Sequence, residues 1–316
     1  MHRLPIFRLL LVGFIVAGAA LFASLPAATA QGGDGSATIS DSRFLPAITG
    51  EWVMVRYAPG SLDRAARLHT RLDQLYEYLD RYADVNSTAT VYVLSEEHWE
   101  NRDPGQPYGF PVRLSGNAAA VPAWGSPATV ELWSRLLGTV PSNQDFLARG
   151  SESEAGSLVL ADSFLALDLC RLHIESLGMF RGPDAQWLAE VATHIACLSA
   201  RRSGQGPLLI EPAMLLSVVP GLEPPTRPGR DGLALDSYGP GVAMPTWLWY
   251  QAQAAVAADL VFQTHERRGW KRMVRAWEKK KAPLTWNDVA SLTPTLVAWR
   301  RGEYRVGGAP GREPSR

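Results

Sequence analysis

Two long apolar segments, 157–177 and 183–202, follow one another with only a short turn between them. Gly178 is a typical residue at the C-terminal end of a helix, and Pro183-Asp184 is a typical start for the next one. Because the connection is so short, we expect the two helices to pack against each other in antiparallel orientation. The sequence therefore predicts a helical hairpin in the middle of the chain.

The residues before this hairpin indicate a strand–helix–strand unit. Segments 51–57 and 88–94 are rich in strand-forming residues. Between them, leucines recur at spacings of four, three and four, which predicts an amphipathic helix over 61–83 (Leu68, Leu72, Leu75, Leu79). We expect Ser61 to cap this helix, and we expect Arg64 and Arg67 to face solvent.

After the hairpin the chain is mainly helical. We expect helices over 247–268 and 270–281, and one or two more within 285–299. A short strand is expected near 117–121 and a short helix near 131–137. The fold class is therefore α+β. It divides into an N-terminal α/β subdomain over 46–140 and a helical subdomain over 141–301, the latter interrupted by a Pro/Gly-rich excursion at 203–245 and followed by a polar tail at 302–316.

The first thirty residues have the pattern of an export signal. A positive head (His2, Arg3, Arg8) precedes an uncharged apolar run from Leu9 to Leu25, and Ala28-Thr29-Ala30 offers a cleavage site before Gln31. We expect a signal peptide over 1–30, a flexible leader over 31–45, and a periplasmic or secreted mature protein. The alternative is an uncleaved N-terminal anchor, because 17 apolar residues are somewhat long for a signal core.

Charge excludes a generally basic nucleic-acid binder, since the 316 residues hold 31 Lys and Arg against 31 Asp and Glu. The total conceals an uneven distribution: residues 265–316 carry 13 basic side chains against 5 acidic ones. This basic end predicts either a solvated helix face and tail or contact with an anionic envelope surface.

The chain has two cysteines, Cys170 and Cys197, one on each helix of the expected hairpin. They lie about equally far from the turn, so they sit at similar heights. Export to an oxidising compartment favours a disulfide, which would stabilise the fold by roughly 3 kcal/mol. Two buried thiols are the alternative.

The order of these elements, together with Trp187-Leu188-Ala189-Glu190 on the second helix of the hairpin, is similar to the gluzincin metallopeptidases. The resemblance is to the exported "peptidase MA-like" proteins related to thermolysin and the aminopeptidases, and covers about residues 48–280. It implies a gluzincin-like fold. In those families the first helix carries His-Glu-x-x-His, and a glutamate about eighteen residues further on completes the zinc ligands.

With Glu190 as that glutamate, the five-residue motif falls on 167–171. Leu167 and Arg171 then replace the two histidines, and neither side chain can bind zinc, because leucine has no lone pair and arginine stays cationic. Asp168 takes the position of the general base but is one methylene shorter than glutamate. The degenerate positions are thus Leu167, Asp168, Arg171 and Glu190.

Two hypotheses of function follow. The first is an exported, catalytically inactive relative of these peptidases, with no cofactor, that binds an unknown envelope protein or peptide. In it Glu190 pairs with Arg171, and His194 packs inside the hairpin. The second is an active zinc-dependent hydrolase that uses Asp168, Glu190 and His194 as metal ligands. If the resemblance is accidental, an exported α+β protein of unknown role remains.

Overall fold

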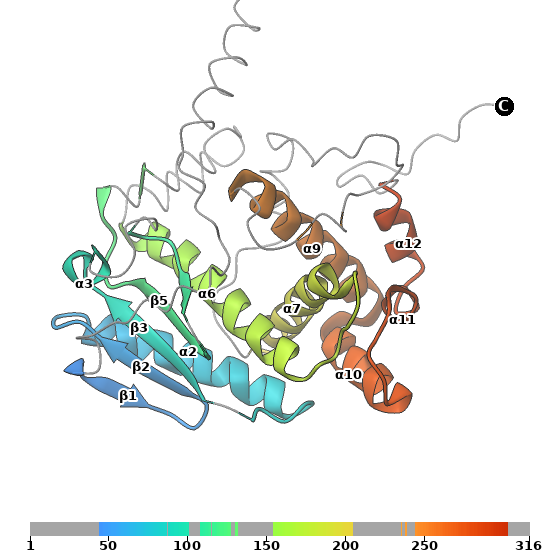
Figure 1. Cartoon of the computed structure of the whole chain (residues 1–316), viewed down its shortest axis with the longest axis horizontal. Coiled ribbons are helices and arrows are strands. Elements are labelled where there is room, and N and C mark those ends of the chain that lie inside the picture. Colours follow the sequence, from blue (N-terminus) through green and yellow to red (C-terminus); the bar gives the residue numbers. More distant parts are fainter. Residues whose placement is uncertain are drawn as a thin grey trace, which may run out of the picture.

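The computed structural model describes residues 44–86, 88–100, 108–114, 116–127, 130–131, 154–204, 235, 238 and 244–302. A small N-terminal sheet is followed by a mainly helical part, so the α+β prediction is confirmed (Figure 1). The signal segment, the leader up to 43, residues 132–137 of the expected short helix, most of the 203–245 excursion and the tail from 303 lie outside these residues.

The sheet has five strands in the order β1-β2-β3-β5-β4. The central strands β2 (Val53–Tyr57), β3 (Ala89–Leu94) and β5 (Ala118–Pro122) are parallel and were all predicted. The antiparallel edge strands β1 (Ala47–Thr49) and β4 (Val112–Leu114) were not. Each has only three residues, too few for an alternating pattern to be visible in the sequence.

Helix α2 (Leu62–Asp80) connects β2 to β3 and corrects two of our expectations. Ser61 precedes the helix, but its hydroxyl donates to the Ala58 carbonyl at 2.7 Å instead of capping the helix. Arg67 is exposed as predicted, whereas Arg64 is buried. Arg64 lies four residues before Leu68, on the apolar face of the helix, and its guanidinium is compensated there by a carboxylate of the next layer.

The predicted hairpin is present as α6 (Glu154–Ser176) and α7 (Ala185–Arg202). Gly178, with a φ of 62°, stands just beyond the end of α6 in the left-handed conformation that glycine adopts readily. Every residue of α7 from Trp187 to Ala200 is buried. α7 therefore runs through the middle of the helical part, between α6 and the helices that follow (Figure 1).

The other described helices are α3 (Glu96–Glu100), α9 (Met244–His265), the short 3₁₀ turn η5 (Glu266–Arg268), α10 (Gly269–Lys280), α11 (Trp286–Ala290) and α12 (Thr295–Arg300). Of these, α3 packs beside β3, and those after the hairpin pack against α7 or against one another. One hydrophobic core continues from the sheet into the helices. Among the described residues, no helix is both long and apolar enough to cross a bilayer.

Candidate functional site

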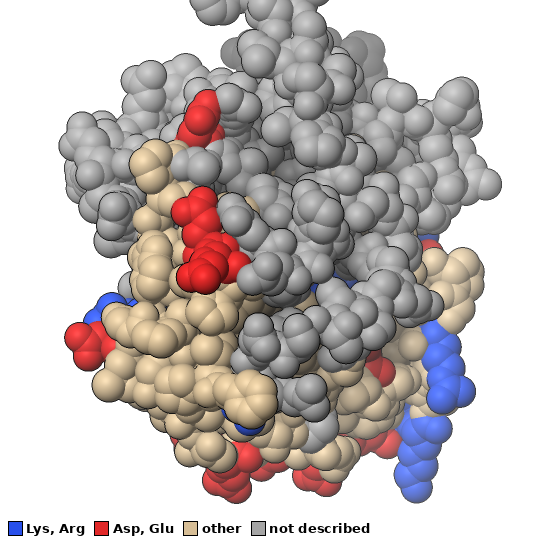
Figure 2. Space-filling view, turned by 60° about the vertical axis from the view of Figure 1, so that its left-hand side comes forward, with Lys and Arg blue, Asp and Glu red and all other residues tan. Residues whose placement is uncertain are grey.

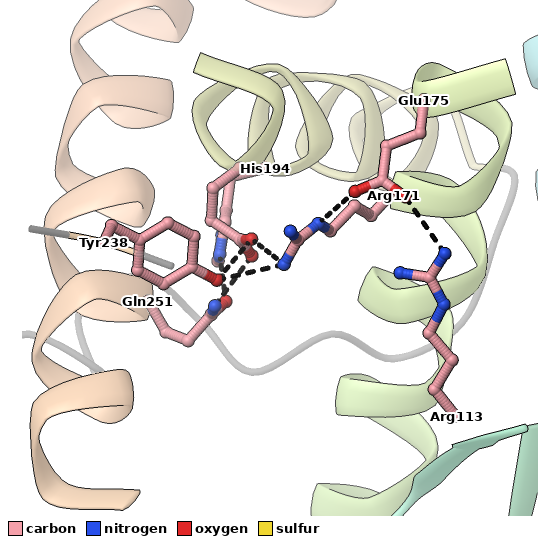
Figure 3. Close-up of polar contacts among 7 residues, drawn as sticks. Arg113, Arg171, Glu175, His194, Tyr238 and Gln251 are labelled. Carbon is pink, nitrogen blue, oxygen red and sulfur yellow. Dashed lines mark hydrogen bonds and ion pairs between the residues drawn. The ribbon is translucent and has the colours of Figure 1, made fainter. Parts of the chain in front are cut away.

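A cluster of buried polar side chains lies where α6, α7 and α9 meet (Figure 3). We define the Glu190 cluster as Arg171 of α6, Glu190 and His194 of α7, Gln251 of α9, and Tyr238 from the chain between α7 and α9. Glu190 and His194 are one helical turn apart and so share a face of α7. Each of the five side chains is buried in an otherwise apolar interior.

Glu190 is the acceptor at the centre of this cluster. Its Oε2 accepts from Arg171 Nη1 at 3.0 Å and from the Tyr238 hydroxyl at 2.8 Å, and its Oε1 accepts from Gln251 Nε2 at 2.7 Å. Removing a carboxylate from water costs several kcal/mol unless hydrogen-bond donors and a cation replace the water molecules. Around Glu190, the Tyr238 hydroxyl, the Gln251 amide and the Arg171 guanidinium do so. The three donors therefore hold Glu190 as an anion inside the protein.

Arg171 connects the buried cluster to the surface. Its Nε donates to Glu175 Oε1 at 2.8 Å, and Glu175 Oε2 accepts from Arg113 of β4 at 3.1 Å. Glu175 and Arg113 are each 34% exposed, compared with 7% for the Arg171 side chain. Burial alone would lower the pKa of Arg171, but Glu190 and Tyr238 raise it above its ordinary value, so the guanidinium stays charged.

His194 takes no direct part in the ion pair. Its Nε2 lies 2.9 Å from Gln251 Oε1. Burial lowers the pKa of His194 despite the opposing charge of Glu190, so the ring is neutral. Because Gln251 already uses Nε2 to donate to Glu190, its Oε1 is the acceptor, and the proton of His194 resides on Nε2.

The residues predicted from the sequence are only partly brought together. The Arg171–Glu190 contact is present, which confirms the expected pairing. Leu167 lies one turn before Arg171 and is buried in the apolar core. Asp168 is partly buried on α6, and no described residue donates a hydrogen bond to it. Within the described ranges, no three His, Cys, Asp or Glu side chains are grouped so that they could hold a metal ion.

Tyr238 and Gln251 are members of the cluster that sequence reasoning missed. Gln251 lies on an alanine-rich helix, where it and Gln253 are polar residues among mainly apolar neighbours, and this was the available signal. Tyr238 belongs to a segment, 237–241, that the sequence predicts to be a turn able to line a cleft, but nothing in the sequence placed this Pro/Gly-rich segment against α7. Its ring packs against Tyr250 at a centroid distance of 4.7 Å and lies under the Arg171 guanidinium at 5.7 Å.

We expect Asp168 to make stability depend on pH. Burial, followed by the Glu190 carboxylate, raises the pKa of Asp168 from 3.8 to about 7. The folded protein thus binds this proton more tightly, and the stabilisation present below the ordinary pKa is lost as the pH rises towards 7. Asp168→Asn cannot ionise, so its free energy of unfolding relative to the wild type should increase across this window, by at most about 1.4 kcal/mol per pH unit.

Urea unfolding of both proteins at several pH values measures this difference, and the exposed Asp63→Asn is the control. Burial also lowers the pKa of His173, to about 4, and that of His194. Both histidines contribute equally to wild type and variant, so their effect cancels in the difference. If the difference in unfolding free energy between Asp168→Asn and the wild type does not change with pH, the raised pKa of Asp168 is contradicted.

Cys170 and Cys197 are free, buried thiols in this structure. Cys170 Sγ donates to the Thr193 carbonyl at 3.9 Å, and Cys197 Sγ to the Ala166 carbonyl at 4.0 Å. Each acceptor lies four residues before the opposite cysteine, so the thiols cross the α6–α7 interface at the same height. Burial, with the Cys197 thiol as the next cause, raises the pKa of Cys170 well above its ordinary value. The disulfide stays a prediction.

Thiol titration tests the predicted disulfide between Cys170 and Cys197. We expect no reaction of the folded protein with a thiol reagent, because both sulfurs are sealed from solvent and the thiolate is disfavoured. After unfolding, protein made under reducing conditions should show two thiols, and protein recovered after export should show none. Two titratable thiols in the unfolded exported protein would contradict the bridge.

Comparison with protein-family models, with curated proteins and with solved structures found no match. The chemistry proposed for this chain therefore rests on the residues of the Glu190 cluster themselves.

Proposed function

We propose that this chain is an exported, catalytically inactive relative of the gluzincin peptidases, with a binding, regulatory or assembly role in the cell envelope. One observation carries the proposal: Arg171 Nη1 lies 3.0 Å from Glu190 Oε2. These are the two positions that would both contact zinc in the metallopeptidase pattern. In this chain a cation of the protein itself neutralises the glutamate.

The residues at these positions do not suit a zinc site. A catalytic zinc needs three ligands with free lone pairs and one open position. Arg171 remains protonated and Leu167 has no donor atom, while the Glu190 carboxylate is already bound by three hydrogen-bond donors. Zinc could reach Glu190 only by displacing a buried guanidinium, which would then be left without its partner.

Asp168 supports the alternative, a hydrolase with an altered metal set. Asp168 is only partly buried, and no described residue donates a hydrogen bond to its carboxylate. In this alternative Asp168, Glu190 and His194 would supply one imidazole and two carboxylates. Gln251 lies between His194 and Glu190, so this set requires Gln251 and Arg171 to move.

Zinc content separates the two proposals. We expect purified wild-type protein to contain far less than one zinc per chain by elemental mass spectrometry, and to cleave no peptide. The variant Leu167→His/Asp168→Glu/Arg171→His restores the complete motif and should bind zinc stoichiometrically. Addition of Glu190→Gln to this variant is the matched control, and should weaken zinc binding by about tenfold or more.

Each outcome bears on one part of the proposal. Stoichiometric zinc in the wild type that disappears in Glu190→Gln overturns the inactive assignment and supports the altered metal set. A folded triple variant that binds no zinc overturns the relationship to gluzincins. Circular dichroism establishes whether the triple variant is folded.

Export is tested separately, by the mass and location of the protein in its own cells. Cleavage after Ala30 leaves a chain that begins at Gln31 in the periplasm or medium. The full-length mass in the membrane fraction supports the anchor instead, and the full-length mass in the cytosol overturns export.

A further inference from the structure

Helix α10, together with its N-cap residue Arg268, carries a row of exposed cations directly opposite its buried face. The buried residues are Gly269, Trp270, Met273 and Val274. On the outer side, Arg268, Arg272, Arg275 and Lys279 follow at spacings of four, three and four, and all four are exposed. We call these four residues the cationic stripe. At 1.5 Å per residue the stripe is about 16 Å long.

The charges of the stripe are not paired with acidic side chains in the described part of the chain. None of the four side chains has an ion-pair partner in the described part of the chain, whereas the neighbouring Lys280 pairs with Asp288. Lys271, on the flank, lies over the Tyr82 ring at 5.8 Å. Four like charges in one row repel each other, so the stripe destabilises the free protein slightly, and a negatively charged partner would relieve this repulsion.

Helix α10 lies on the side of the helical part that is away from the sheet (Figure 1). On the face in Figure 2, acidic and basic side chains both occur, and acidic ones gather along the lower edge. The four cations of the stripe all lie on the outer side of the helix, away from its buried residues, so an anionic partner would meet this side of α10.

The shape and composition of the stripe favour a flat partner. It is the outer ridge of a helix, so it meets a planar surface along its length. Single-stranded nucleic acid is bound by exposed aromatic rings between the cations. On α10 both tryptophans face inward instead: Trp270 is fully buried and Trp277 packs against the core. A ridge that presents only cations suits the phosphate headgroups of a bilayer.

We propose that the cationic stripe of α10 docks the protein on the surface of an anionic phospholipid bilayer. This goes beyond the proposed function and does not depend on the relationship to gluzincins. The contact is electrostatic and peripheral: guanidinium and ammonium groups lie at the headgroup phosphates, and no part of α10 enters the hydrocarbon. Each cation near such a surface increases the partition coefficient about fivefold.

Sedimentation with vesicles tests the proposal on the full chain. The two probes are vesicles of phosphatidylcholine alone and vesicles in which about one third of the lipid is phosphatidylglycerol. Binding to the neutral vesicles measures any contribution of the apolar run at 9–25. We expect the excess binding to the anionic vesicles to fall steeply between about 0.15 M and about 0.5 M NaCl.

Charge reversal in the stripe should remove this excess. Arg272→Glu/Lys279→Glu should lower the partition coefficient for anionic vesicles at least about 25-fold. The matched control is Arg67→Glu/Arg181→Glu, which makes the same change in net charge at two exposed arginines outside the stripe. We expect it to lower the coefficient by less than about fivefold.

If the stripe variant and the control variant lose the same amount of binding to anionic vesicles, the proposal is wrong. Equal binding of the wild type to neutral and anionic vesicles would also overturn it. Tighter binding to a DNA oligonucleotide than to anionic vesicles would overturn it in favour of a nucleic acid. If the reversed variant is unfolded by circular dichroism, Arg272→Gln/Lys279→Gln replaces it, with an expected decrease of about 25-fold. A folded glutamine variant with wild-type binding contradicts the proposal.

Discussion

Arg171→Ala should lower the free energy of unfolding by about 3–5 kcal/mol, measured by urea denaturation. The substitution leaves the Glu190 carboxylate in the interior with only the Tyr238 hydroxyl and the Gln251 amide as donors. An uncompensated buried charge is one of the few causes of so large an effect from a single change. Glu175 loses a partner as well, but it is one-third exposed and can bind water.

A double variant distinguishes loss of charge compensation from loss of packing. Arg171→Met/Glu190→Gln removes both charges and retains most of the volume. We expect it to be more stable than Arg171→Ala, by about 2 kcal/mol or more, because no ion is left unpaired. If the double variant is no more stable than the single one, packing around Arg171 dominates and our account of the pair is wrong.

Asp162→Ala should have an effect of similar size at a second buried ion pair, again about 3–5 kcal/mol. Arg64 Nη1 and Nη2 donate to the two oxygens of Asp162 at 3.1 and 2.8 Å, and Arg64 Nε donates to the Pro122 carbonyl at 2.8 Å. This guanidinium thus joins α2, α6 and the end of β5. Without Asp162 it stays buried, bound to one carbonyl and without an anion.

The matched control is an ion pair of the same type at the surface. Glu77, in the last turn of α2, is paired with Arg81, the residue that caps the end of the helix, and both side chains are more than 40% exposed. Glu77→Ala should cost less than about 1 kcal/mol in the same urea experiment. Equal losses for Asp162→Ala and Glu77→Ala would show that burial does not set the strength of the Arg64 contact.

Local pattern was sufficient to predict the main elements. The leucine spacing predicted α2, and the Gly178 stop with the Pro183 start predicted the α6–α7 hairpin. Once the hairpin is assumed, its antiparallel packing brings Arg171 opposite Glu190, so this contact was accessible from the sequence too. The periodic pattern averages over several turns, which is why it is robust to one unusual residue.

Contacts between distant segments were not accessible. Arg64 was expected in solvent because arginine is mostly exposed, and its partner Asp162 is 98 residues away. Tyr238 reaches Glu190 across 48 residues of sequence. Such contacts depend on how the layers of the fold pack against each other, and the hydrophobic periodicity of one segment carries no information about this packing. The contact of Tyr238 with Glu190 could therefore be identified only from the structure.

The position of α7 has a consequence for how the protein opens. Fourteen consecutive residues of this helix, Trp187–Ala200, are buried, and it packs against α2, α6, α9 and α10. Its amide hydrogens can exchange with solvent only when the elements around it separate. They should therefore be the slowest to exchange, at a rate set by the global unfolding free energy. Helix α2 lies before α7 in the sequence and α10 lies after it, and both pack against α7. We therefore expect the N-terminal and C-terminal parts of the described chain to unfold together with α7, in a single transition.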